Sequence, residues 1–143
     1  MKKLIYISLM LVFSIVQTSQ AQSVLGKWKT IDDETGEAKS IVEIYEQNGK
    51  VYGKVITIFD KTKENNLCDK CEGSKKNKPV KGMVILEGAK KDGDSWEGGT
   101  ILDPTKGKVY KCTLSLENKD KLKLRGYVGI SLLGRTQYWE RVK

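Results

Sequence analysis

Hydrophobic and polar residues alternate with a period of two along most of the chain after its leader-like first 21 residues. In the segment 109–116, every second residue from Tyr110 to Leu116 is hydrophobic and the residues between them are polar. This alternation is typical of a β-strand with one buried face. About eight such segments occur, and no convincing helix follows residue 21. The predicted strands cover residues 24–31, 40–47, 50–59, 82–88, 95–102, 109–116, 121–128 and 135–142.

Turn residues between these segments indicate that neighbouring strands pair with each other. Asn48 and Gly49 form the strongest signal, because a type I′ hairpin turn needs positive φ at both central positions. The other connections are short apart from one long polar loop, residues 61–78, and sequential strands usually lie side by side. We therefore expect an all-β fold, a single antiparallel up-and-down β-barrel over residues 22–143, with a two-sheet sandwich as the alternative. An eight-stranded barrel has no exposed edge and holds side chains or one small ligand.

Residues 1–21 have the pattern of a cleavable secretory signal. Two lysines precede an almost wholly apolar run over residues 4–16, and the small residues Ser19 and Ala21 fit the cleavage site of signal peptidase. A membrane-spanning helix needs about 20 apolar residues, and this run is shorter. We expect cleavage before Gln22 and a soluble mature protein that is periplasmic or secreted and not integral to the membrane.

The charge of the chain is moderately basic. Its net charge is +8, with 26 Lys and Arg against 18 Asp and Glu, and the lysines are spread along the sequence. An exported protein rarely meets nucleic acid, so we expect no nucleic-acid partner. The lysines then form a solvated surface, or attract the protein weakly to an anionic component of the cell envelope.

The sequence contains few residue combinations that could act as a catalytic site. The chain contains no His, which excludes Ser-His-Asp and Cys-His pairs and every His-ligated metal site. Asp32, Asp60 and Asp103 could act as an acid and base on a glycan, but all three stand next to turns, where Asp caps the local backbone. We expect a non-catalytic protein with no cofactor and no metal.

Three cysteines remain to be assigned. Cys68 and Cys71 lie in the long loop, and Cys112 lies on a predicted strand with its side chain inward. Cysteines this close often form a disulfide in an oxidising compartment, so we expect a Cys68–Cys71 bond. A bond from one of them to Cys112 is the next alternative. A redox-active dithiol or a metal site is less consistent with a polar loop that has no helix behind it and no further ligands.

Two motifs mark the predicted ends of the barrel wall. Gly26 and Trp28 lie on the first strand, and Trp139 and Arg141 lie on the last. A Gly-x-Trp motif near the N-terminus with a basic residue on the final strand resembles the calycins, the superfamily of lipocalin, fatty-acid-binding and avidin-like barrels. The resemblance implies that Trp28 plugs one end of the barrel while a cation lies across its ring. We expect these four residues to form the structural seam.

Further motifs run through the chain: Gly26-x-Trp28-x-Thr30-x-Asp32-Asp33, Cys68-x-x-Cys71, Asn77-x-Pro79-x-x-Gly82-Met83, Gly98-Gly99-x-Ile101-x-Asp103-Pro104, and Arg125-Gly126-Tyr127-x-Gly129 through Gly134-Arg135-Thr136-Gln137-x-Trp139. Over residues 24–142 they resemble a bacterial family of small exported proteins known as domain of unknown function 2147 (DUF2147). The resemblance implies no known activity, substrate or catalytic residue.

Aromatic and cationic residues are the candidates for ligand binding. Trp96 and Tyr110 could stack on a ligand in the lumen, although core packing is the commoner role of such residues. Arg125 and Arg135 could clamp an anionic group, with Tyr127 beside them. These five residues form the predicted ligand site.

The predicted connection between the last two strands carries apolar residues where polar ones are usual. Ile130, Leu132 and Leu133 could form a lid, a partner-facing patch or a plug that folds into the barrel. The best-supported function is an exported barrel that binds a small hydrophobic or amphipathic molecule. The alternative is a structural or interaction module that binds a partner in the cell envelope.

Overall fold

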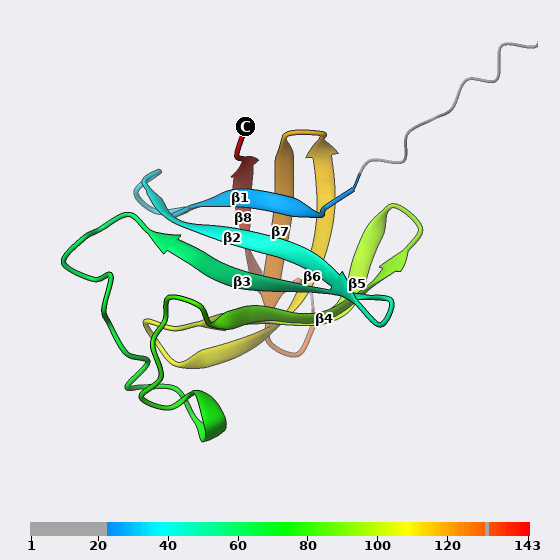
Figure 1. Cartoon of the computed structure of the whole chain (residues 1–143). Coiled ribbons are helices and arrows are strands. Elements are labelled where there is room, and N and C mark those ends of the chain that lie inside the picture. The colour runs from blue at the N-terminus through cyan, green and yellow to red at the C-terminus, as the bar shows by residue number, and fades with distance from the viewer. Residues whose placement is uncertain (1–22, 131) are drawn as a thin grey trace, which may run out of the picture.

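Eight antiparallel strands form a closed barrel in which each strand pairs with its neighbours in sequence (Figure 1). The computed structural model describes residues 23–130 and 132–143, so the predicted signal sequence lies outside the described residues. The up-and-down barrel expected from the sequence is confirmed, and the sandwich alternative is wrong. The elements are β1 (Gly26–Ile31), β2 (Ala38–Gln47), β3 (Lys50–Ile58), the 3₁₀ helix η1 (Gly73–Lys75), β4 (Val84–Asp92), β5 (Ser95–Asp103), β6 (Lys108–Asn118), β7 (Lys121–Tyr127) and β8 (Gly134–Arg141).

The strand boundaries follow the expected ones closely, and the main difference is at β4. The alternation predicts a strand over residues 82–88, whereas β4 runs to Asp92. Its last residues are polar and exposed, but Lys90 and Lys91 pair with Glu97 and Trp96 of β5. Backbone pairing in this hairpin therefore extends beyond the segment whose side chains alternate. At the β2–β3 hairpin, Asn48 and Gly49 both have positive φ, as the predicted turn requires.

The interior of the barrel is densely packed at one end, which we call the closed end. The start of β1, the end of β8 and the hairpins β2–β3, β4–β5 and β6–β7 lie there. The other four connections surround the opposite end, which we call the mouth. The closed half is filled by side chains that are at most 2% exposed: Trp28, Ile44, Leu114, Leu122 and Trp139. These described side chains pack together as one hydrophobic core.

The seam at the closed end is held by Arg141. Its guanidinium lies 4.2 Å from the ring of Trp28, and it donates hydrogen bonds to the carbonyls of Ser23, Leu25 and Lys119 at 2.7–2.8 Å. Gly26 leaves room for it, since an added Cβ would lie 2.9 Å from Nη1 of Arg141 and the φ of +125° disfavours other residues. The cation lies across the tryptophan ring, as the calycin resemblance implies.

The long β3–β4 connection packs against the β5–β6 turn. Cys68 and Cys71 form a disulfide, and both are buried. The sulfur of Cys68 lies 3.4 Å from the carbonyl oxygen of Pro104, in the β5–β6 turn. An added Cβ at Gly107 in the same turn would collide with the carbonyl of Lys70. The expected Cys68–Cys71 bond is therefore present, while Cys112 is free and buried in the barrel.

The described residues include no helix that is long and apolar enough to cross a membrane.

Candidate functional site

The mouth half of the barrel interior is less completely filled than the closed half. Four residues in this half point inward, as their pairing with neighbouring strands shows: Ile58, Ile101, Tyr110 and Gln137. Each of them is only partly buried. Gly126 lies between two of them, because a Cβ built at this glycine would be 3.6 Å from Ile101 and 3.6 Å from Tyr110. The mouth therefore combines an apolar wall with a glycine at which one added methyl group would make ordinary contacts.

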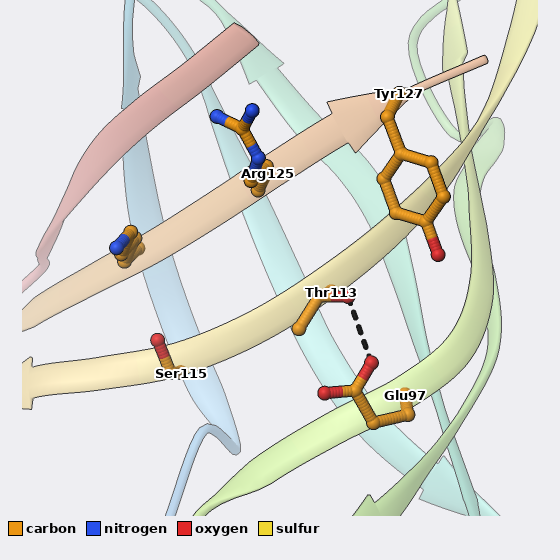
Figure 2. A pocket seen from close by; sticks show the side chains of 6 residues that line it. Glu97, Thr113, Ser115, Arg125 and Tyr127 are labelled. Carbon is orange, nitrogen blue, oxygen red and sulfur yellow. Dashed lines mark hydrogen bonds between the residues drawn. The ribbon is translucent and has the colours of Figure 1, made fainter. Parts of the chain in front are cut away.

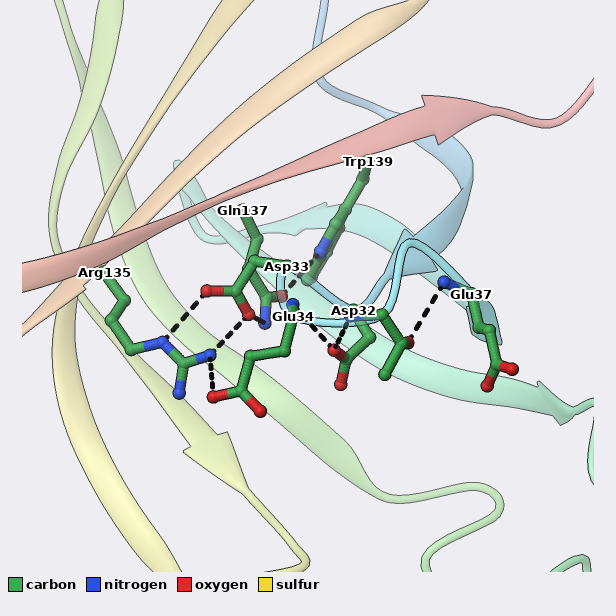
Figure 3. Close-up of polar contacts among 8 residues, drawn as sticks. Asp32, Asp33, Glu34, Glu37, Arg135, Gln137 and Trp139 are labelled. Atoms are coloured by element: carbon green, nitrogen blue, oxygen red, sulfur yellow. Dashed lines mark hydrogen bonds and ion pairs between the residues drawn. The ribbon is translucent and has the colours of Figure 1, made fainter.

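The polar side of the mouth is a cluster centred on Asp33 and Arg135 (Figure 3). Nε and Nη2 of Arg135 donate to the two carboxylate oxygens of Asp33 at 3.0 and 2.6 Å, and Nη2 also reaches Glu34 at 3.2 Å. Gln137 donates to Asp33 at 3.4 Å and accepts a 3.2 Å hydrogen bond from the indole of Trp139. A continuous polar chain thus leads from the rim to the packed core.

The β1–β2 turn positions this cluster. Oδ1 of Asp32 accepts hydrogen bonds from the backbone amides of Glu34 and Thr35 at 2.9 and 3.0 Å, which fixes the turn and directs Asp33 toward β8. Asp60 and Asp103 stabilise turns in the same way. Asp60 accepts a hydrogen bond from the backbone amide of Thr62, and Asp103 accepts one from the backbone amide of Thr105. These three carboxylates stabilise turns, as the sequence favoured, and they do not converge on a catalytic pair.

The Asp33 carboxylate is stabilised in its charged form. Partial burial raises its pKa, but the hydrogen bonds from Arg135, its own backbone amide and Gln137, together with the charge of Arg135, outweigh burial and leave the pKa below its usual range. The pKa of Arg135 is raised by the same contact. Both groups are charged at neutral pH, and Glu34 brings a second carboxylate to the same guanidinium.

This arrangement changes the expected role of the two arginines. Arg125 and Arg135, which the sequence predicts as a clamp for an anion, lie on opposite faces of the wall. Arg135 has the inward register of Trp139, whereas Arg125 is adjacent to the inward Leu124 and therefore projects outward. Arg135 is also already neutralised by Asp33. At the polar side of the mouth, the guanidinium is therefore in contact with two carboxylates.

The five predicted ligand residues are distributed over three places. Tyr110 and Arg135 lie at the mouth. Trp96 is 7% exposed near the closed end, where Nζ of Lys91 lies 5.7 Å from its ring. Arg125 and Tyr127 line a hollow on the outer wall. They do not form one site, and only the first two remain candidates for a ligand in the mouth.

The outer hollow crosses β5, β6 and β7 (Figure 2). Its volume is about 300 Å³, and its lining is polar or aromatic throughout: Glu97, Thr113, Ser115, Lys123, Arg125 and Tyr127. Four of these residues were not predicted. The alternation could have indicated them, because polar residues occupy the same outward positions on neighbouring strands. Thr113 pairs with Arg125, and Ser115 pairs with Lys123.

Cys112 is not a reactive thiol in this fold. Burial, with a smaller contribution from the charge of Glu97, raises its pKa to about 12. The thiol is therefore protonated at neutral pH, and a protonated thiol is a poor nucleophile. Within residues 23–130 and 132–143, no three Cys, Asp or Glu side chains come together in a way that could hold a metal ion.

Comparison with solved structures places the fold among known barrels. Protein HP1028 from Helicobacter pylori, described as belonging to the lipocalin family, superposes with a TM-score of 0.75. The two share 23% identity, and the match covers 85% of this chain and 84% of that one. A comparison with curated proteins found no match.

The fold is therefore a lipocalin-like closed barrel. The model of a bacterial family described as "Uncharacterized protein conserved in bacteria (DUF2147)" matches residues 26–141, nearly the whole described barrel. Those residues include the seam, the mouth and the outer hollow, so the chain belongs to the DUF2147 family.

Proposed function

We propose that this protein is an exported binding protein that holds a small amphipathic molecule in the mouth half of its barrel. The observation that carries the proposal is the difference in burial along the interior. Inward residues are at most 2% exposed around Trp28 and Trp139, whereas Ile58, Ile101 and Tyr110 at the mouth are partly accessible. A barrel that is packed at one end and accessible at the other is suited to hold a ligand at the accessible end.

The chemistry of the mouth indicates which ligand fits. Its apolar part would lie against Ile58, Ile101 and Tyr110. Its polar part would meet Gln137 and the Asp33–Arg135 pair, where the carboxylates of Asp33 and Glu34 outnumber the single guanidinium. A neutral or cationic polar end fits this surface better than an anionic one. The amphipathic ligand therefore carries hydrogen-bonding or cationic groups at its polar end.

Export is part of the proposal. The leader-like residues 1–21 support it, and so does the buried Cys68–Cys71 disulfide, because such bonds persist in oxidising compartments such as the periplasm.

The test uses the uncharged fluorescent probe N-phenyl-1-naphthylamine, which becomes brighter in apolar sites. Gly126→Val adds a branched side chain between Ile101 and Tyr110. We expect the wild-type protein to bind the probe and the variant to bind it at least about tenfold more weakly, because the lost space cannot be recovered by repacking. Thr100→Val, on the outward face of β5, is the matched control and should bind like the wild type.

Two outcomes would contradict the proposal. One is a folded Gly126→Val protein, with wild-type circular dichroism, that binds the probe as tightly as the wild type. The other is a wild-type protein that fails to bind the probe at all.

The alternative function, an interaction module for an envelope partner, has its own supporting observation. Val128, Ile130, Leu132 and Leu133 on the β7–β8 connection are 60–83% exposed. They do not plug the barrel, and clustered exposed apolar residues are often contact surfaces. Leu132→Glu combined with Leu133→Glu should abolish cross-linking to an envelope protein if this function is correct, while leaving probe binding unchanged.

A further inference from the structure

The outer hollow of Figure 2 is a second candidate site, separate from the lumen. It lies on the outward face of β5–β7, on the other side of the wall from Cys112 and Leu114. Its volume of about 300 Å³ is at the lower limit for small-molecule sites. The described residues that line it are polar or aromatic, so a polar ligand fits it.

One wall of the hollow is a fixed carboxylate. Oε1 of Glu97 accepts a 2.8 Å hydrogen bond from Ser95, and Oε2 accepts a 2.8 Å hydrogen bond from Thr113. A carboxylate has about four lone-pair positions, so two remain to accept hydrogen bonds from a ligand. Figure 2 shows Glu97 and Thr113 joined in this way, with Tyr127 on the same strand as Arg125.

The opposite wall carries two cations. Lys123 and Arg125 lie two residues apart on β7 and therefore project from the same face of the strand. Nη1 of Arg125 donates to the hydroxyl of Thr136 at 3.0 Å, which helps to orient the guanidinium. Lys123 forms no salt bridge with any residue that the structure describes, and Glu97 forms none either.

The separation of these charges determines which ligand fits. Glu97 stands on β5 and the cations on β7, two strand spacings away, which is about 10 Å. Glu97 and Lys123 thus lie on different sides of the hollow and form no salt bridge with each other. A ligand that brings an anionic group to β7 and hydrogen-bond donors to β5 would satisfy both walls.

We propose that this hollow binds an acidic sugar, a hydroxylated ring that carries one carboxylate. The sugar carboxylate binds Lys123 and Arg125, its hydroxyls donate to Glu97, and the ring packs on Tyr127. A single ring spans the distance between the walls. A phosphorylated ligand fits less well, because its second negative charge would face Glu97. The net charge of +8 also favours the approach of an acidic glycan.

The test is isothermal titration of the full-length mature protein with D-glucuronate, and with D-glucose and glucose 6-phosphate as comparisons. We expect glucuronate to bind with millimolar affinity, and both comparison sugars to bind at least about tenfold more weakly. Lys123→Gln should weaken glucuronate binding by about tenfold, because a charge-assisted contact is lost. Glu97→Gln should weaken it several-fold.

Lys54→Gln is the matched control, since Lys54 lies on the outward side of β3, outside the hollow. It should bind glucuronate as the wild type does. Equal binding of glucuronate and either comparison sugar to the wild type, equal binding of glucuronate to the wild type and to the Lys123→Gln variant, or no binding of glucuronate would overturn the proposal. Probe binding in the lumen should be unaffected by Lys123→Gln, so failure here is distinguishable from failure of the function proposed for the mouth.

Discussion

Arg135 and Asp33 join the two ends of the barrel wall where the strands themselves no longer pair. β1 and β8 pair at Trp28 opposite Arg141 and at Lys29 opposite Glu140, and the amide of Val142 donates to the carbonyl of Lys27. Toward the mouth, the two-pronged contact of Arg135 with Asp33 takes the place of backbone hydrogen bonds. Part of the closure near the mouth therefore depends on side chains that are 102 residues apart in sequence.

Removing this contact should destabilise the barrel modestly. Arg135→Gln loses the paired hydrogen bonds, but the guanidinium is 53% exposed, so solvent screening limits the effect to about 1 kcal/mol of unfolding free energy. Urea denaturation measures this change. Lys39→Gln, which breaks the more exposed contact with Glu37, is the control and should change stability by less than about 0.5 kcal/mol. Equal effects of the two substitutions would contradict the seam role of Arg135.

The same contact predicts a pH dependence with a definite sign. The pKa of Asp33 is lowered in the folded protein from its ordinary value of 3.8. Its contribution to stability is therefore fully present above that value and is lost as the pH falls through the lowered folded pKa. The stability advantage of the wild type over Asp33→Asn, measured by urea denaturation, should be constant from pH 7 to 5 and shrink below about pH 4. An advantage that grows on acidification would contradict the assigned contact.

Arg141 should be the most sensitive residue of the seam. Arg141→Met removes three hydrogen bonds to backbone carbonyls and the cation over Trp28, and we expect a loss of about 2–3 kcal/mol in unfolding free energy. Lys143→Met is the matched control, because Lys143 is 82% exposed and has one long ion pair, to Asp120. Its effect should be within about 0.5 kcal/mol of zero. A mild Arg141→Met phenotype would show that the packed tryptophans alone hold the closed end.

The states of the three cysteines predict how many of them iodoacetamide alkylates, which mass spectrometry measures. The native protein should not react with iodoacetamide at neutral pH, because Cys112 is buried with a pKa of about 12 and the other two cysteines form a disulfide. Unfolding without reductant should allow one adduct, and unfolding with reductant should allow three. Alkylation of the native protein at Cys68 or Cys71 would contradict the disulfide.

The barrel could be predicted from the sequence because its determinants are local. Alternation specified the strands, Asn48 and Gly49 specified a hairpin, and Gly26 and Trp28 indicated the seam. The alternation also places Arg125 on the outward face, because the inward Leu124 precedes it. Its pairing with Arg135 was predicted only because the two arginines flank the same connection in the sequence. The contact of Asp33 with Arg135, and the arrangement of Glu97, Lys123 and Arg125 around one hollow, depend on how the sheet closes. No local pattern in the sequence predicts that closure.

The central claim, that the mouth half of the lumen binds a small amphipathic molecule, is tested most directly by mapping the bound probe. ¹⁵N-labelled mature protein titrated with N-phenyl-1-naphthylamine should show its largest amide shifts at Ile101, Tyr110, Gly126 and Gln137, which line the mouth. Shifts confined to the outer hollow around Lys123, or to the exposed residues from Val128 onward, would contradict the claim.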